Sequence, residues 1–338
     1  MPKKLTIYDV AKKANVAIST VSRVLNDSPY VSDETKSKVD LAIKELDFRP
    51  QFNARKLARS EPQIIAVAVP TFTTPFFNEV LKGVKDELMD IDLDFIIYNT
   101  GSADPEENFK NFLDRGVPDA LLIFSIDITD EIHNRLKGMQ VPVVLVGSNH
   151  PEYNYIYWDN YQGGTLAAKH LIDKGYRDFG IIRSHSKSQI TDDREKGFRD
   201  TLSEAGISLA EDRIVTGITK KHAGFSEEAG YEAVKILKDR DQIPEVIFCT
   251  NDAQAIGAMH AIDELGLSIP EDIGIMGYDN IKVARYLGLT TVDQQMYDVG
   301  IKAIKSLRAL IKDMEQPSKH VVIPPTIVER KSTQKPKS

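Results

Sequence analysis

From Pro62 onward the chain repeats one pattern, in which short apolar runs alternate with stretches that space their apolar residues as amphipathic helices do. The first half contains the runs IIAVAVP, DFIIYNT, ALLIFS and PVVLVGS, and the second half contains FGIIRS, RIVTGIT, VIFCTND and IGIMGYD. Continuous apolar runs are typical of parallel strands that are buried on both faces, with helices as the crossovers. The pattern therefore predicts two similar α/β halves, each built on a parallel sheet.

Two such halves face each other across a crevice, and ligands of parallel sheets collect beyond the carboxyl ends of the strands. Polar residues at the strand ends are therefore candidates for ligand binding. Asn251, at the end of VIFCTND, carries an amide that both donates and accepts hydrogen bonds. Asp252 beside it is a candidate cap for the helix that follows.

Ahead of this alternation, Thr6–Asn26 has the pattern of two short helices around a tight turn at Asn15, a residue type that tolerates a left-handed backbone. The outer side of the second helix carries short polar groups and a guanidinium, which suit phosphates and base edges: Ser19, Thr20, Ser22, Arg23 and Asn26. Any amphipathic helical hairpin also has a polar outer side, so this pattern alone leaves both interpretations open. A third helix is expected from a cap at Asp33 to Leu46.

The charge distribution separates the head from the rest of the chain. Residues 1–60 carry 12 Lys and Arg against 7 Asp and Glu, a net charge of +5, whereas the remainder carries 31 against 43, a net charge of −12. A basic head on an acidic body suits a polyanionic partner for the head.

Several function classes find no support in the sequence. No apolar run approaches the length of a membrane span and the first residues lead into no signal-peptide core, so we expect a cytoplasmic protein with no membrane partner. Cys249 lies within VIFCT and is expected to be a buried strand thiol rather than a nucleophile. The seven histidines are scattered, and no glycine-rich phosphate loop or metal-spaced His/Cys cluster occurs. The sequence thus predicts no enzyme activity, no metal and no cofactor.

The phrase TIYDVAKKANVAISTVSRVLND, followed by VSDETKSKV, resembles the N-terminal domain of the LacI/GalR family of transcriptional regulators. Later phrases resemble successive blocks of the same family in the same order: TPFFNEVLKGV, WDNYQGG, DREKGF, CTNDAQAIGA and IPEDIGIMGYDN. The resemblance covers about residues 5–330. It implies an α/β protein with an N-terminal three-helix, helix-turn-helix head and a two-lobed, periplasmic-binding-protein-like core of parallel sheets.

The resemblance also divides the chain into parts. It implies a DNA-binding head at 1–49, a hinge helix or linker at 50–61, an effector-binding and dimerising core at 62–330, and a polar tail at 331–338. The first lobe is expected at about 62–160 plus 291–320 and the second at about 161–290 plus 321–330, with strands near Leu289–Val292 and Val321–Val328 crossing between them. The tail contains no leucine heptad, which favours a homodimer over a tetramer.

As implied by the resemblance, the protein is a sequence-specific transcriptional repressor whose head reads a near-palindromic operator in double-stranded DNA. The implied DNA contacts of the head are Ile7, Tyr8, Ala17, Ile18, Ser19, Thr20, Ser22, Arg23, Asn26, Ser32 and Thr35. In the hinge helix, Leu57 is the implied minor-groove wedge, with Ala54 and Arg55 beside it.

The resemblance further implies an effector pocket between the lobes. It places Phe76 and Phe77 at the mouth, Phe225 at a ring-stacking position, and Arg194 and Asp279 against the effector, with Asn251 at the nearby strand end. A guanidinium and a carboxylate in one cleft match the hydrogen-bonding groups of a polyhydroxylated ligand.

Departures from the family pattern bear on the ligand. Gly147 and Ser148 stand where sugar-binding relatives often have an acidic residue, and Ser188 and Ile190 replace polar side chains of purine-responsive members. The sequence therefore favours a carbohydrate or sugar phosphate over a purine.

Two alternatives to this interpretation remain open. One branch of the family is controlled mainly by a phosphocarrier protein, and Met296–Gly300 echoes the YD-G block of that branch. A soluble, periplasmic-type sugar receptor would share the two-lobed core, although the attached head argues against it.

Overall fold

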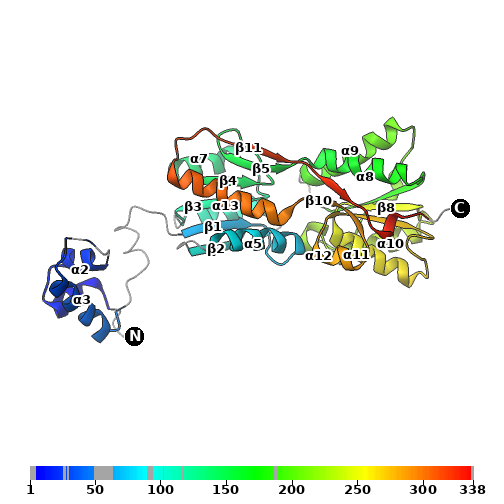
Figure 1. The fold of residues 1–338 in the computed structure, drawn as a ribbon. Coiled ribbons are helices and arrows are strands. Elements are labelled where there is room, and N and C mark those ends of the chain that lie inside the picture. The colour runs from blue at the N-terminus through cyan, green and yellow to red at the C-terminus, as the bar shows by residue number, and fades with distance from the viewer. Residues whose placement is uncertain are drawn as a thin grey trace. The chain divides into compact units, whose positions relative to one another are not determined.

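The computed structural model describes residues 5–25, 28, 30–48, 64–89, 94–101, 103–115, 118–185 and 189–335. The chain divides into two compact units, residues 1–63 and residues 64–338 (Figure 1).

The described part of the first unit is helical. It contains α1 (Ile7–Ala14), α2 (Ile18–Leu25) and α3 (Asp33–Glu45), which enclose a small core with Val10, Val21 and Val39 at its centre. Asn15 adopts the predicted left-handed conformation between α1 and α2, with φ 55°. Ser32, and not the expected Asp33, caps α3, because the Ser32 hydroxyl accepts the backbone N–H of Thr35.

The first lobe of the second unit is built on a parallel sheet with strand order β11-β5-β4-β3-β1-β2. The strands are β1 (Ile64–Val69), β2 (Asp94–Asn99), β3 (Ala120–Phe124), β4 (Val143–Val146), β5 (Asn154–Trp158) and β11 (His320–Ile323). One face packs against α5 (Pro75–Leu88) and α13 (Met296–Lys312), and the other against α6 (Pro105–Leu113) and α7 (Asp130–Met139) (Figure 1).

The second lobe repeats this plan with strand order β12-β10-β9-β8-β6-β7, parallel except for β12 against β10. The strands are β6 (Phe179–Arg183), β7 (Ile214–Thr216), β8 (Val246–Cys249), β9 (Gly274–Asp279), β10 (Thr290–Asp293) and β12 (Thr326–Val328). The helices are α8 (Asn160–Asp173) with α9 (Gln189–Glu204) on one face, α10 (Glu227–Asp239) with α11 (Asp252–Glu264) on the other, and α12 (Lys282–Tyr286) after β9. Short 3-10 turns complete it: η1 (Glu211–Arg213), η2 (Lys221–Gly224) and η3 (Lys331–Thr333).

The predicted α/β fold with two parallel-sheet lobes is confirmed, but two expected lobe boundaries are wrong by a few residues. The strand expected to cross near Leu289–Val292 is β10, which pairs with β9 in the second sheet, so the chain crosses only after Asp293. Residues 321–323 were expected in the second lobe, yet they belong to β11 and pair with β5 in the first. The chain therefore changes lobe after Trp158, after Asp293 and after Ile323. Cys249 is fully buried in β8, as predicted.

Candidate functional site

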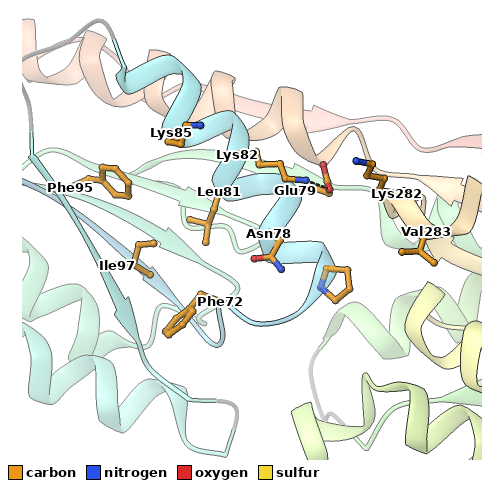
Figure 2. Close-up of a pocket in the computed structure, with 11 residues that line it drawn as sticks. Phe72, Asn78, Glu79, Leu81, Lys82, Lys85, Phe95, Ile97, Lys282 and Val283 are labelled. Atoms are coloured by element: carbon orange, nitrogen blue, oxygen red, sulfur yellow. Dashed lines mark hydrogen bonds and ion pairs between the residues drawn. The ribbon is translucent and has the colours of Figure 1, made fainter.

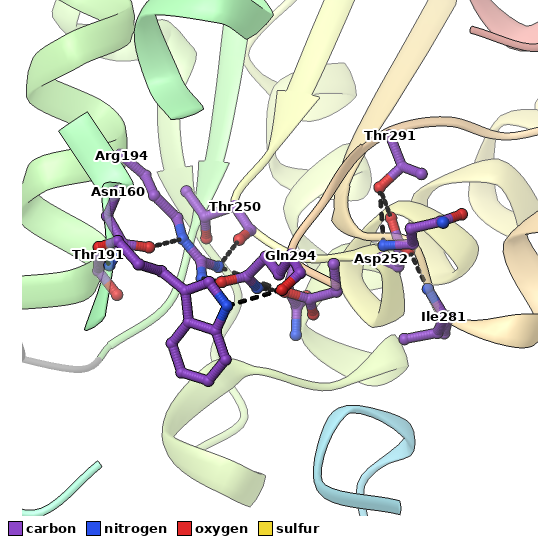
Figure 3. Close-up of polar contacts among 12 residues, drawn as sticks. Asn160, Thr191, Arg194, Thr250, Asp252, Ile281, Thr291 and Gln294 are labelled. Atoms are coloured by element: carbon purple, nitrogen blue, oxygen red, sulfur yellow. Dashed lines mark hydrogen bonds and ion pairs between the residues drawn. The ribbon is translucent and has the colours of Figure 1, made fainter. Parts of the chain in front are cut away.

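Arg194 lies at the centre of a buried polar network near the carboxyl ends of the second sheet's strands. It projects from the first turns of α9 and is only 4% exposed. Its guanidinium donates to Asn160 Oδ1 at 2.9 Å, to the Thr250 carbonyl at 2.7 Å and to Gln294 Oε1 at 3.3 Å (Figure 3). The guanidinium also stacks on the ring of Tyr278, with 3.7 Å between Arg194 Cζ and the ring centre. A guanidinium with acceptors on every nitrogen is fixed in one orientation.

Asp279 ends β9 and faces this guanidinium. Its Oδ1 lies 3.6 Å from Arg194 Nη1 and accepts a hydrogen bond from Gln294 Nε2 at 2.5 Å. Arg194 and Asp279, which the sequence analysis assigned to one cleft, therefore lie side by side. Burial raises the pKa of Asp279 to about 7, although the positive charge of Arg194 opposes the rise. A carboxyl with this pKa can accept or donate a hydrogen bond near neutral pH.

Sequence reasoning missed Gln294, which links the two lobes. Its side chain contacts Arg194 and Asp279, while its backbone carbonyl accepts the indole N–H of Trp158 at 2.7 Å. Trp158 ends β5 in the first lobe, whereas Gln294 follows β10 of the second. The available signal was the position of Gln294 directly after β10, since a strand near Leu289–Val292 was expected from the sequence.

The predicted aromatic pair at the start of α5 divides into two environments. Phe77 is 8% exposed and belongs to the apolar core beneath α5. Phe76 is half-buried, and its ring centre lies 5.5 Å from that of Trp158 in an edge-on arrangement. Phe76 is thus the more exposed member of the pair.

Phe225 and Asn251 lie on neighbouring segments of the second lobe. Phe225 is half-buried and follows η2, whose Gly224 carbonyl accepts a hydrogen bond from Gln254 Nε2 of α11 at 2.8 Å. Asn251 is the N-cap of α11, because its Oδ1 accepts the N–H of Gln254 at 2.8 Å. Asp252 is therefore not the cap that the sequence suggested.

Two buried hydroxyl oxygens in the first lobe lack a hydrogen-bond partner among the described residues. Thr74 precedes α5, and Ser148 lies just beyond the end of β4. Buried hydroxyls are nearly always hydrogen-bonded in folded proteins, so each of these is a candidate for contact with water or a bound polar molecule.

Several of the predicted DNA-contacting residues of the head are exposed, whereas Ile7 packs against its core. Tyr8 is 66% and Ile18 is 41% exposed, whereas Val21 and Val24 on the other side of α2 are buried. Ala17, Ser19, Arg23 and Ser32 are exposed, and Ile7, Thr20, Ser22 and Thr35 are half-buried. The predictions for Asn26, Ala54, Arg55, Leu57 and the whole 50–61 linker lie outside the described residues, as does Ser188.

Among the residues that the structure describes, no group of three or more His, Cys, Asp or Glu side chains could hold a metal ion. In the same part of the chain, no helix has both the length and the apolar character needed to span a membrane.

Comparisons with known proteins match both units. Residues 6–51 match the family model of bacterial regulatory proteins of the lacI family, and residues 168–333 match the periplasmic binding protein-like domain. The HTH-type transcriptional repressor PurR of Erwinia tasmaniensis is 33% identical over 334 residues, which cover 97% of this chain and 96% of that protein.

Solved structures resemble the chain over nearly its full length. The lac repressor dimer bound to operator and the anti-inducer ONPF is 25% identical, with a TM-score of 0.77 over 98% of this chain and 99% of that one. The complex of the transcriptional regulator CelR with cellobiose is 26% identical, with a TM-score of 0.69 over 97% of this chain and 99% of that one.

Proposed function

Because the chain belongs to the lacI family of bacterial regulatory proteins, we propose that it is a dimeric repressor whose affinity for operator DNA is set by a sugar between its core lobes. DNA-binding repression with an effector-binding core follows from the family itself. The observation that carries the control by a ligand is the Arg194 network, in which Gln294 connects the second lobe to Trp158 of the first. PurR and the lac repressor are repressors and CelR is a transcriptional regulator, and we propose no enzymatic activity for this chain. We expect the protein in the cytoplasm, because a regulator that binds operator DNA acts there.

We assign base reading to the exposed side of α2. Ile18 offers an apolar contact to a thymine methyl, and Ser19 and Arg23 offer hydrogen bonds to base edges or phosphates. Thr20 and Ser22 are assigned to the major groove as well. Contacts with the DNA backbone are assigned to Tyr8, Asn26, Ser32 and Thr35, and Ile7 and Ala17 complete the proposed interface. Leu57, flanked by Ala54 and Arg55, is proposed as a wedge at the operator centre.

We assign the effector to the crevice around Arg194, Asp279 and Asn251, with Phe76 and Phe225 as ring contacts. Amides, a guanidinium and unpartnered hydroxyls beside an aromatic ring are the groups that carbohydrate sites use. Each nitrogen of Arg194 already donates to an oxygen of the protein, and Asp279 lies beside it. Few N–H groups of Arg194 are left to bind a phosphate, and an ionised Asp279 beside it would repel one, so a neutral sugar fits better than a sugar phosphate.

We propose that a second copy of the chain binds at a groove of about 540 Å³ on the core, which is lined by apolar side chains together with charged ones such as Glu79, Lys82 and Lys282 (Figure 2). Phe72, Phe95 and Ile97 line its first-lobe side, and Val283 of α12 lines its second-lobe side. On β2, the edge strand of the first sheet, three consecutive apolar side chains are exposed: Phe95, Ile96 and Ile97. An uncovered apolar edge strand is a surface for association.

This dimer surface explains how a sugar could act on DNA affinity. The groove contains residues of both lobes, so a change in their relative orientation changes how two copies face each other. Effector binding and operator binding are then reciprocally coupled through that orientation.

Control by a phosphocarrier protein is the second candidate function. Tyr297, in the block Met296–Gly300, is 41% exposed at the start of α13 and donates to Asp86 Oδ2 at 3.1 Å. A pull-down with a phosphocarrier protein in the absence of any sugar tests this candidate.

The primary test is selection of operators from random DNA duplexes by the purified protein, followed by titration of the selected site against salt and ligands. We expect a near-palindromic site whose affinity falls steeply with salt, and a shift of the binding curve by D-ribose or cellobiose. A shift caused by a purine base and by neither sugar would contradict the sugar assignment and point to a purine effector. Failure to select any site would favour control by a protein partner over control by a sugar.

A further inference from the structure

The turn after β9 holds Asp279 in a conformation that residues with side chains rarely adopt. Asp279 has φ 121° and Asn280 has φ 61°. Such conformations cost free energy and persist only where the surrounding contacts enforce them. In this conformation the Asp279 carboxylate reaches Gln294 and Arg194.

Asp252 supplies one set of these enforcing contacts. It is fully buried, and its Oδ2 accepts the N–H of Ile281 at 2.9 Å, while its Oδ1 accepts the Thr291 hydroxyl at 2.6 Å (Figure 3). The Thr291 oxygen in turn accepts the N–H of Asn280 at 3.2 Å. A single carboxylate therefore fixes both residues that follow Asp279.

The neighbouring strand is shaped to admit this carboxylate. A Cβ atom at Gly277 of β9 would lie 2.1 Å from Asp252 Oδ1, so any larger residue would displace the carboxylate from the turn. Burying a carboxylate is costly unless hydrogen bonds and charge compensate for it. Because Asp252 does not cap α11, its hydrogen bonds to the turn are the contacts that compensate for the cost of its burial.

Arg330 also contacts this turn. Its Nη2 donates to Asn280 Oδ1 at 2.7 Å, and its Nη1 donates to the Leu289 carbonyl at 2.6 Å. The Arg330 backbone N–H donates to the Thr290 hydroxyl at 2.9 Å, which anchors this late segment on β10. Burial raises the pKa of Asp252 well above its ordinary value, and the positive charge of Arg330 opposes that rise.

We propose that Asp252 and Arg330 are positioning residues for the effector site. They hold the turn at 279–281 so that Asp279 faces the effector, and neither Asp252 nor Arg330 contacts the effector. This inference rests on the proposed function, because it takes Asp279 to be an effector contact.

The first test is a pair of crystal structures of the full chain, Asp252→Ala and Asp252→Asn. In Asp252→Ala the Ile281 N–H and the Thr291 hydroxyl lose their acceptor, so the turn should relax and Asp279 should lose its hydrogen bond to Gln294. In Asp252→Asn the amide oxygen still accepts from Ile281 and the amide nitrogen can donate to Thr291, so the turn should be kept. An unchanged turn in Asp252→Ala overturns the proposal whether or not any sugar binds.

The second test is calorimetry with D-ribose and cellobiose as the probes. For a sugar that the wild type binds, Asp252→Ala and Arg330→Gln should bind about tenfold more weakly or worse, and Asp252→Asn should stay within about threefold of the wild type. Glu329→Gln is the matched control, since Glu329 pairs with Lys174 at 2.6 Å and does not contact the turn. Arg330→Gln keeps the test decisive if Asp252→Ala fails to fold.

The two tests separate the inference from the proposed function. Equal sugar affinity in the wild type, Asp252→Ala and Arg330→Gln would overturn the positioning role and leave the effector site standing. A wild type that binds neither sugar, combined with a relaxed turn in Asp252→Ala, would overturn the sugar assignment and leave the positioning role standing.

Discussion

Asp279 combines burial, an unusual backbone conformation and a neighbouring cation in a single side chain. Its ordinary pKa of 3.8 is raised to about 7 in the folded protein, chiefly because the carboxyl is removed from water. Between these two values the folded state holds a proton that the unfolded state has released. The folded state is therefore favoured at the acid end of this range.

The first prediction follows from this difference. The contribution of Asp279 to stability is fully present below its unfolded pKa and is lost as pH rises through about 7, so the free energy of unfolding should fall across this range. Asp279→Asn removes the titrating group and should show a smaller fall. Urea unfolding of both proteins at about pH 5 and about pH 8 measures the difference. Equal falls would mean that Asp279 is ionised throughout.

The second prediction concerns Arg23 on the exposed side of α2. Arg23→Ala should weaken operator binding by about 1–3 kcal/mol and reduce the salt slope by about one, while leaving sugar affinity unchanged. Lys44→Ala is the control, because it removes an equal charge from an exposed position near the end of α3. If both variants weaken binding equally, Arg23 contributes only through its charge.

Single residues also show what could be predicted from the sequence. Arg194 and Asp279 could be found because each lies within a short recognisable motif. Gln294, Asn160 and Trp158 were harder to find, because their roles depend on where the chain crosses between lobes. Asn251 and Asp252 are both good capping residues, and a shift of one position in the start of α11 decided which of them became the cap.

Among the elements, α8 and α9 set the depth at which Arg194 enters the site. A Cβ atom at Gly164 of α8 would lie 2.0 Å from the Arg194 carbonyl oxygen, and one at Gly197 of α9 would lie 2.0 Å from that of Tyr161. The two backbones are therefore in direct contact at their crossing. No side chain lies between them that could yield.

The third prediction tests this crossing. Gly164→Ala should force the helices apart, destabilise the protein by about 2 kcal/mol or more, and weaken sugar binding through the displacement of Arg194. Gly138→Ala is the matched control, because a Cβ atom at Gly138 of α7 meets nothing within 4 Å. It should stabilise the protein by about 0.5–1 kcal/mol. Urea unfolding of both variants is the measurement, and a neutral Gly164→Ala would contradict the argument.

The helices and strands were easier to predict than the points at which the chain crosses from one lobe to the other. Continuous apolar runs marked β1, β3, β4, β8 and β9 because parallel strands are buried on both faces. The run that became β10 gave no indication of its sheet, since pairing with β9 is a long-range property that the run itself does not encode. The lobe boundaries shifted for this reason.

On the scale of the whole molecule, the groove on the core connects assembly to DNA affinity. The fourth prediction is that Ile97→Glu, which places a charge in the groove, should yield monomers in analytical ultracentrifugation and weaken operator binding. Ile218→Glu is the control, because Ile218 is 75% exposed on the second lobe and does not line the groove. A dimeric Ile97→Glu protein would require the second copy to dock elsewhere.

The chain contains one tryptophan, Trp158, and the fold places it where the lobes meet. Its indole N–H is held by the Gln294 carbonyl, and its ring touches Phe76. Intrinsic fluorescence excited selectively at tryptophan therefore comes from this point of the molecule alone. A change in the spacing of the lobes, or a sugar beside Phe76, alters the polarity around the indole and shifts the colour of its emission. Trp158 is thus an intrinsic fluorescence probe of the crevice between the lobes, and it requires no added dye or label.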